Sequence, residues 1–142
     1  MQNKVTKLIL YCDGGARGNP GPAAIGFIIY VIGKEGELEE LARRGETIGE
    51  TTNNVAEYRA LIAALETAAM FRPDVVEVRL DSELIGKQMR GVYRVKDKDL
   101  QKLFVQAKQR EMKLKRVVYT LIPRALNKEA DKEVNRALDG VT

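Results

Sequence analysis

Apolar residues recur along the chain in two spacings, one typical of strands and the other of helices. Continuous or alternating apolar runs predict five strands, over residues 5–12, 24–32, 38–48, 75–80 and 117–122. Apolar positions three and four residues apart predict four helices, over residues 55–70, 82–89, 97–111 and 127–138. The strand at 38–48 is the most polar of the five, so we expect it at an edge of the sheet.

The order of these elements, βββαβααβα, limits the folds that the chain can adopt. Short turns between the first three strands predict an antiparallel meander, whereas the intervening helices predict that the last two strands join in parallel through right-handed crossovers. We therefore expect an α/β fold with a five-stranded mixed sheet flanked by helices. The 142 residues suit one domain, spanning 1–142.

The absence of histidine and the single cysteine exclude several kinds of chemistry. With no histidine and only Cys12, the chain has neither a serine–histidine–acid triad nor a zinc site of histidine and cysteine. No stretch resembles a secretion signal or a membrane span, so we expect a cytoplasmic protein without a membrane partner. An enzyme of this composition depends on carboxylates, lysines, hydroxyls or a bound metal.

The charged residues are unevenly distributed. Residues 1–82 carry 9 basic and 12 acidic side chains, residues 83–116 carry 11 and 4, and residues 117–142 carry 4 of each. The basic excess of the middle segment suggests a polyanionic partner bound beside acidic positions. A solvated helix face explains the same charges without any partner, so both interpretations stay open at this point.

Two aspartates follow strands at the end where α/β sheets commonly bind ligands. Asp13 comes directly after the first predicted strand and Asp81 directly after the fourth. Each also has a structural explanation, because Asp13 precedes a glycine as turn residues often do, and Asp81 can cap the next helix, as Ser82 can. If the two strands are neighbours, the two carboxylates meet at one edge of the sheet.

Glu57 lies in the first turn of the helix predicted at 55–70. With Asn54 as the N-cap, Glu57 occupies the third helical position of a capping box, which is a purely structural role. The four residues 51–54 (TTNN), however, supply more hydroxyl and amide groups than one cap needs. Such groups are suited to bind phosphate or sugar, which leaves a functional role for Glu57 open.

Asp131 falls within the last predicted helix, at the border of its apolar stripe. Aspartate has a low helix propensity and is unfavourable beside apolar packing unless a partner satisfies its charge. An ion pair with Lys128 or Lys132 is one explanation of its presence, and a metal ion is another.

Taken together, Asp13, Glu57, Asp81 and Asp131 favour a metal site. Clustered carboxylates repel one another, and a hard divalent cation with oxygen ligands, Mg²⁺ or Mn²⁺, relieves that repulsion. Two such ions bridged by a phosphate form a common arrangement for the in-line hydrolysis of a phosphodiester.

Four segments, in this order, resemble the motifs of type 1 ribonuclease H. They are residues 11–21 (YCDGGARGNPG), 52–57 (TNNVAE), 80–82 (LDS) and 127–131 (NKEAD). The likeness extends over about residues 5–138, and the predicted order of strands and helices agrees with the fold of that family. The first two segments are the most specific.

The resemblance implies an endonuclease that uses two divalent ions to cut the RNA strand of RNA/DNA hybrids, leaving 3′-hydroxyl and 5′-phosphate ends. It implies that the catalytic metal ligands are Asp13, Glu57, Asp81 and Asp131. Asp13 would bridge both ions, and Glu57 would also contact a 2′-hydroxyl or a water that orients the attack.

The resemblance also implies how the hybrid is bound. The residues expected to contact it are Gly14, Gly15, Asn19, Thr52, Asn53 and Asn54. The glycines and Asn19 would face the RNA backbone, the two later asparagines the minor groove, and Thr52 a phosphate of the DNA strand. Such contacts recognise the shape and the 2′-hydroxyls of the duplex rather than its base sequence, so we expect cleavage that is largely independent of sequence. Because a single small domain can act on a duplex alone, we also expect a monomer.

Two departures from the best-known bacterial members resemble an archaeal-like branch of the family. The loop at residues 122–126 (IPRAL) carries Arg124 where those members have a histidine. Arg124 can replace the histidine electrostatically at the substrate but cannot relay a proton. Residues 90–96 (RGVYRVK) leave no room for a basic insertion, so substrate binding falls to dispersed side chains such as Lys87, Arg90, Arg94, Lys96 and Lys98.

Three alternatives stay open from the sequence. The archaeal-like branch includes members that also cut double-stranded RNA, which would make that duplex a second partner. A non-catalytic module would bind the hybrid without cleaving it. An unrelated α/β protein would use the four acids only as caps and turn residues, and would bind neither Mg²⁺ nor Mn²⁺.

Overall fold

The computed structural model describes residues 6–140, and the order of its elements confirms the predicted one. The strands are β1 (Lys7–Ala16), β2 (Gly21–Ile32), β3 (Leu38–Thr51), β4 (Val75–Leu80) and β5 (Val117–Leu121). The helices are α1 (Asn53–Ala69), α2 (Glu83–Met89), α3 (Lys98–Glu111) and α4 (Lys128–Asp139), with a short 3₁₀ helix, η1 (Arg124–Leu126), before α4. Residue Val5, expected at the start of the first strand, lies outside the described residues.

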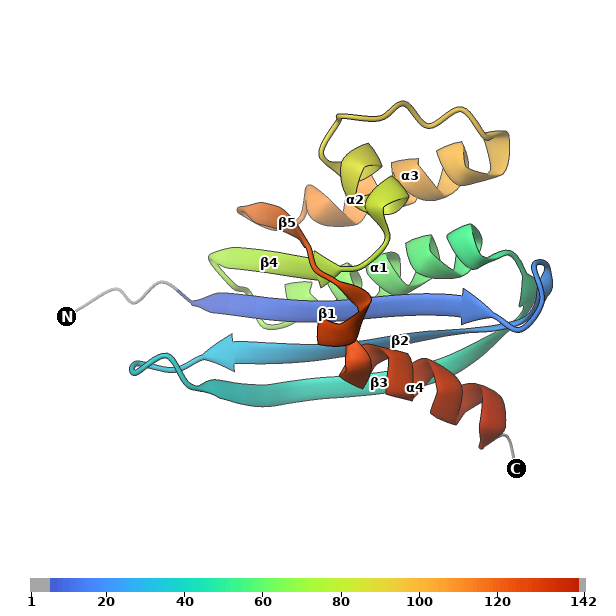
Figure 1. Ribbon diagram of the computed structural model, residues 1–142. Coiled ribbons are helices and arrows are strands. Elements are labelled where there is room, and N and C mark those ends of the chain that lie inside the picture. Colours follow the sequence, from blue (N-terminus) through green and yellow to red (C-terminus); the bar gives the residue numbers. More distant parts are fainter. Residues whose placement is uncertain (1–5, 141–142) are drawn as a thin grey trace.

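The strands form one sheet in the order β3-β2-β1-β4-β5 (Figure 1). β1 pairs antiparallel with β2, and β2 with β3, whereas the pairs β1–β4 and β4–β5 are parallel. This is the expected mixed sheet, with the polar strand β3 at an edge. Because β1 and β4 are parallel neighbours, residues that follow their paired segments lie at the same edge of the sheet.

Helices cover both faces of the sheet. α1 packs on one face beside α3, and α4 crosses the other face over β2 and β3 (Figure 1). The main core lies between the sheet and α1, where Leu8, Leu10 and Phe27 belong to the same buried cluster as Tyr58 and Leu61. None of the helices within residues 6–140 is long and apolar enough to cross a membrane.

β1 runs further than its apolar residues predict. We expect from the sequence that the strand ends at Cys12 with Asp13 in a turn, but pairing with β2 continues through Asp13 to Ala16. The assignment of Asp13 to a turn is therefore wrong. Pairing of β1 with β4 stops earlier, at Tyr11, so Asp13 is fixed by β2 on one side while its other side faces the space beyond β4.

α4 lies close to the sheet because β2 presents a glycine beneath it. Gly26 of β2 lies opposite Asp13 of β1, and a Cβ atom at Gly26 would be 2.6 Å from the carbonyl oxygen of Ala130 in α4. Arg43 of β3 holds the same helix through a 2.9 Å ion pair with Glu133. This close approach brings the first turn of α4 to the row of residues that contains Asp13.

Candidate functional site

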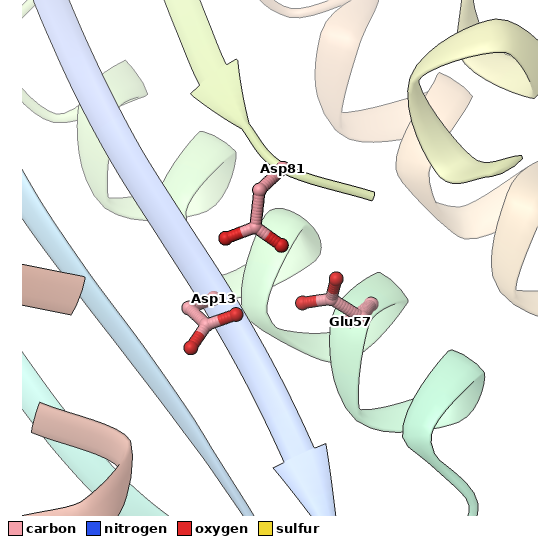
Figure 2. A group of neighbouring side chains, drawn as sticks. All are labelled: Asp13, Glu57 and Asp81. Carbon is pink, nitrogen blue, oxygen red and sulfur yellow. The ribbon is translucent and has the colours of Figure 1, made fainter. Parts of the chain in front are cut away.

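Three carboxylates from distant parts of the chain converge beside the end of β4 (Figure 2). Asp13 comes from β1, Glu57 from the N-terminal part of α1, and Asp81 directly follows β4. One oxygen atom of each carboxylate lies within 4.8 Å of the other two. Asp13 is only 6% exposed, so water shields its charge poorly from its neighbours.

Glu57 is held by the backbone of β1. The N–H of Gly14 donates to Glu57 Oε1 at 2.6 Å, which fixes one carboxylate oxygen against the strand. The cap of α1 is Thr52, whose hydroxyl accepts from the N–H of Val55 at 3.3 Å. The capping box with Asn54 is therefore wrong, and the carboxylate of Glu57 belongs to the site rather than to the helix end.

The two adjacent glycines of β1 differ in what surrounds them. A Cβ atom at Gly14 would collide with the backbone carbonyl of Ala56, because α1 lies directly against β1 there. At Gly15 a Cβ atom would lie 3.9 Å from Asn53 and 4.0 Å from Val134, which is ordinary van der Waals contact. The packing of α1 against β1 is thus a sufficient reason for a glycine at position 14, with no need for a bound nucleic acid. Gly15, by contrast, has free space beside it that opens into the cleft.

Asp81 does not cap α2. Ser82 is the cap, and its hydroxyl accepts from the N–H of Ile85 at 3.2 Å. One oxygen of Asp81, Oδ2, instead accepts a hydrogen bond from Asn127 Nδ2 at 2.9 Å. The carboxylate of Asp81 is therefore oriented by a buried side chain from the start of α4 rather than by a helix end.

Asp131 and Arg124 border the same cleft as the three convergent acids, and the cleft has a volume of about 450 Å³. Asp131 is exposed, and its Oδ2 accepts from Asn135 Nδ2 at 3.3 Å. Within residues 6–140 it forms no ion pair with Lys128 or Lys132, the latter of which pairs with another acid of α4. The ion-pair explanation of Asp131 therefore does not hold.

Burial and mutual repulsion raise the pKa values of the two innermost carboxyls. The pKa of Asp13 rises from 3.8 to about 7, chiefly through burial and then through the charges of Asp81 and Asp131, while Arg124 opposes the rise. The pKa of Glu57 is also well above its ordinary value, first because of burial and next because of the charges of Asp13 and Asp81. A nearby positive charge would favour the ionised form of both groups.

The donor set fits a hard divalent cation. Carboxylate oxygens are the ligands that Mg²⁺ and Mn²⁺ prefer, and three of them within 4.8 Å of one another can bind one ion together. The raised pKa of Asp13 means that its charge is unfavourable without a compensating cation. Asp13, Glu57 and Asp81 are therefore the residues best placed to hold a metal, with Asp131 beside them.

The remaining residues expected to bind substrate line two adjoining depressions. Gly15, Asn53 and Asn54 belong to the cleft of the acids. Asn19 and Thr52 line a neighbouring depression of about 260 Å³, to which Asn54 also contributes. Asn19 Oδ1 accepts from the N–H of Asn53 at 2.9 Å, so the turn after β1 is tied to the start of α1.

Two asparagines that are not among the predicted site residues contact the acids. Asn127 Nδ2 donates to Asp81, and Asn135 Nδ2 donates to Asp131. Asn135 is in turn held by a 3.2 Å hydrogen bond from Arg17. In the sequence, Asn127 begins the segment 127–131 that resembles a motif of the family and stands where a helix cap is expected, and Asn135 follows Asp131 by one helical turn. Both patterns have common structural explanations.

The basic residues available to a polyanion lie on the surface. Arg90, Arg94 and Lys96 are exposed in the connection between α2 and α3, which forms an open loop at the top of Figure 1. Lys87 is engaged by Glu83 through a 2.6 Å ion pair. The connection contains no further helix or strand, which agrees with the expected lack of a basic insertion.

The chain is similar to known proteins over almost its whole length. The family model described as RNase H matches residues 5–138. Ribonuclease HI of Halobacterium salinarum is 46% identical over 129 residues, which are 91% of this chain and 63% of that protein. A bifunctional protein of Mycobacterium tuberculosis is 42% identical over 133 residues, which are 94% of this chain and 36% of that protein. The chain thus spans less than two thirds of the length of these curated relatives.

Solved structures share the fold described above. The crystal structure of RNase H1 from Halobacterium salinarum has a TM-score of 0.86 and 44% identity, covering 95% of this chain and 99% of that one. The crystal structure of LC11-RNase H1 in complex with an RNA/DNA hybrid has a TM-score of 0.84 and 48% identity, covering 94% of this chain and 97% of that one.

Proposed function

This chain belongs to the ribonuclease H family, and we propose that it is a metal-dependent endoribonuclease that hydrolyses the RNA strand of RNA/DNA hybrids. The observation that carries the proposal is the convergence of Asp13, Glu57 and Asp81 within 4.8 Å in an open cleft. The likeness to LC11-RNase H1, which was crystallised with a hybrid, supports the choice of substrate. Cleavage to 3′-hydroxyl and 5′-phosphate ends, with little dependence on base sequence, belongs to the same proposal.

In this proposal Asp13, Glu57, Asp81 and Asp131 hold Mg²⁺ or Mn²⁺, with two ions present when substrate is bound. When bound, the cations supply the positive charge that stabilises the phosphate under attack. Asp13 interacts electrostatically with each of the other three acids and would therefore be a ligand of both ions. Glu57, fixed by the N–H of Gly14 at 2.6 Å, keeps its second oxygen for a 2′-hydroxyl or the attacking water.

The side chains around the start of α1 are suited to bind a hybrid by its shape. Asn53 Oδ1 accepts from the N–H of Ala16 at 2.8 Å, and Asn19 Oδ1 accepts from the N–H of Asn53 at 2.9 Å. Because both amide oxygens are used within the protein, we propose their NH₂ groups as donors to the substrate, joined by Asn54 in the minor groove. Thr52 would bind a phosphate of the DNA strand.

Arg124 is proposed to bind a substrate phosphate beside the acids. Its charge lowers the pKa of Asp13 against the effect of burial, so it lies within electrostatic reach of the site. A guanidinium binds phosphate through paired hydrogen bonds but does not release its proton. Because the chain has no histidine, proton transfer falls to water and the carboxylates.

The proposal is tested by incubating matched RNA/DNA, RNA/RNA and DNA/DNA duplexes with the protein in Mg²⁺ or Mn²⁺, alongside Asp13→Asn. Cleavage of the RNA strand of the hybrid is the expected result, and cleavage of RNA/RNA as well would extend the substrates to double-stranded RNA. Binding of the hybrid without cleavage would identify a non-catalytic module. Cleavage by Asp13→Asn at the wild-type rate would exclude the metal mechanism.

We also propose that residues 1–142 act as one catalytic domain and as a monomer. The strands within residues 6–140 share one sheet, and the buried cluster draws on both ends of the chain, from Leu8 to Tyr119. Light scattering on the protein while it cleaves a hybrid checks the oligomeric state. The mass of a dimer under those conditions would contradict the second part of the proposal.

A further inference from the structure

Asn127 contacts Asp81 and the residue that precedes Asp13. It is only 1% exposed and directly precedes α4. Its Nδ2 donates two hydrogen bonds, one at 2.8 Å to the carbonyl oxygen of Cys12 and one at 2.9 Å to Asp81 Oδ2. One side chain therefore joins the start of α4 to the residue before Asp13 and to the carboxylate that follows β4.

The same side chain does not do what asparagine usually does at this position. An asparagine before a helix commonly accepts a hydrogen bond from the first turn, but Asn127 makes no such side-chain cap to α4. Its Oδ1 is buried and has no hydrogen-bond partner within the described residues. Both features are unfavourable for stability, and residues that break local rules in this way are concentrated at functional sites.

We propose that Asn127 is a positioning residue that holds the carboxylate of Asp81 in the orientation that binds the divalent cation, an inference that rests on the proposed function. The hydrogen bond to Oδ2 restricts rotation of the carboxylate and leaves the other oxygen for the metal. The N–H of Asp131 also donates to the backbone carbonyl of Asn127 at 3.1 Å. Asn127 thus holds Asp81 directly, and its other hydrogen bonds reach the backbone of Asp131 and of the residue before Asp13.

The amide is suited to this position because it donates without charge. A lysine or arginine there would also hold Asp81, but its positive charge would repel the cation. An aspartate would add a further negative charge to a group in which the pKa of Asp13 is already raised to about 7. A neutral donor orients the carboxylate and keeps its full charge available to the metal.

Two substitutions separate this role from a role in folding. Asn127→Ser can form the missing helix cap, but its short side chain cannot span Cys12 and Asp81. Asn127→Leu keeps the approximate size and removes both donors. The control is Tyr119→Phe, which deletes a 2.6 Å hydrogen bond from a mostly buried hydroxyl to Glu111 and lies on β5, outside the residues that line the cleft.

The measurements are Mn²⁺ affinity by calorimetry without substrate, the unfolding temperature, and kcat and KM with a hybrid. We expect both Asn127 variants to bind Mn²⁺ about 10–100-fold more weakly and to lose kcat by a similar factor, with KM for the hybrid unchanged. Tyr119→Phe should lose stability while its Mn²⁺ affinity stays at the wild-type value. Asn127 variants with the same Mn²⁺ affinity and kcat as this control would overturn the inference.

A measurement on the unaltered protein does not depend on how the variants fold. In an NMR titration with Mg²⁺, the side-chain NH₂ signals of Asn127 should shift with the same midpoint as the heat of binding. Signals of Asn127 that stay constant while the backbone N–H of Asp81 shifts would contradict the inference. If the wild-type protein neither binds the cations nor cleaves a hybrid, the proposed function fails. If it does both, and the Asn127 variants keep the Mn²⁺ affinity and kcat of Tyr119→Phe, only this inference fails.

Discussion

The acids of the cleft and the basic residues of segment 83–116 are held in different ways. Asp13 is 6% exposed within a paired strand, and Glu57 and Asp81 each accept a hydrogen bond from another part of the chain. Arg90 and Arg94 are exposed on the connection between α2 and α3, and neither is held by an ion pair in the described part of the chain.

This difference follows from what each region does in the proposed function. A metal ion needs its oxygen ligands at fixed distances, so the fold keeps carboxylates buried although burial and repulsion raise their pKa values. The phosphates of a duplex attract basic residues over longer distances, and exposed, adaptable side chains are sufficient. We therefore expect changes in the cleft to alter rate and stability strongly, and changes in the basic segment to alter affinity weakly and in a salt-dependent manner.

The largest effect is expected from Asp13→Asn. Loss of the central carboxylate should reduce the single-turnover rate on a hybrid by more than the ~10–100-fold that is typical of residues that only support metal ligands. The folded structure should persist, because asparagine has nearly the same shape and removes a charge that is unfavourable when buried. Single-turnover cleavage and circular dichroism check the two parts. A large loss of helix signal in the variant would contradict the second part.

The next effect concerns the pH dependence of stability in the metal-free protein. The folded protein keeps the proton of Asp13 up to about pH 7, whereas the unfolded chain releases it near the ordinary pKa of 3.8. The free energy of unfolding should therefore fall as pH rises between these values, by about 1.4 kcal/mol for each unit of raised pKa. Urea unfolding at a series of pH values, in the presence of a chelator, measures this slope.

Two controls isolate the cause of that slope. Asp13→Asn should reduce the slope, and the slope that remains belongs to Glu57, whose pKa is also raised, first through burial. The variant should be more stable than the wild type at pH 8 without metal, and Mg²⁺ should stabilise only the wild type strongly. The pKa of Glu77 is lowered, first by its hydrogen bond from Arg79, so its effect on the free energy of unfolding has the opposite sign. The stability that Glu77 contributes is present at neutral pH and is lost only as the pH falls below the ordinary pKa of a glutamate. Because the chain has no histidine, an unchanged slope in Asp13→Asn would assign the slope to Glu57 and contradict the contribution expected from Asp13.

The adjacent glycines of β1 give a smaller, matched comparison within the cleft. Gly14→Ala forces a Cβ atom against the backbone of Ala56, so we expect a loss of about 1–3 kcal/mol in the free energy of unfolding and slower cleavage as Glu57 moves. Gly15→Ala meets only ordinary contacts and should stay within about 0.5 kcal/mol of the wild type. A raised KM for the hybrid with Gly15→Ala would support close approach of the RNA backbone, and an unchanged KM would argue against it.

The order of strands and helices can be predicted from the sequence because each element carries its own apolar pattern. Residues 24–32, for example, form a nearly continuous apolar run, and the structure has β2 there. The extent of β1 cannot be predicted in the same way, since the local sequence Asp13-Gly14-Gly15 favours a turn. Only pairing with β2 keeps these residues extended, and that pairing is a property of the folded sheet.

The residues of the site likewise include some that the local sequence predicts and one contact that only the folded chain creates. Asp13, Glu57 and Asp81 can be predicted because they stand at recognisable positions beside strands and a helix start, and the structure brings them together. The contact between Asn127 and Asp81 joins residues 46 positions apart. Asn127 begins the segment 127–131 that resembles a motif of the family, but its place before a helix is also that of an ordinary cap. Its contact with Asp81 therefore becomes visible only when the sheet edge and α4 are assembled.

The smallest effect is expected in the basic segment, which tests the other side of the comparison. Arg90→Ala, Arg94→Ala and Lys96→Ala should each leave kcat unchanged and raise KM for a hybrid by up to about fivefold, since an exposed charge contact contributes roughly 0.2–1 kcal/mol. A residue that contacts a phosphate should also reduce the slope of log KM against log salt concentration by about 1. Lys34→Ala, in the exposed turn between β2 and β3, is the matched control and should change neither quantity. A fall in kcat would mean that the segment takes part in the chemistry, and an unchanged salt slope in all three variants would mean that it is only a solvated surface.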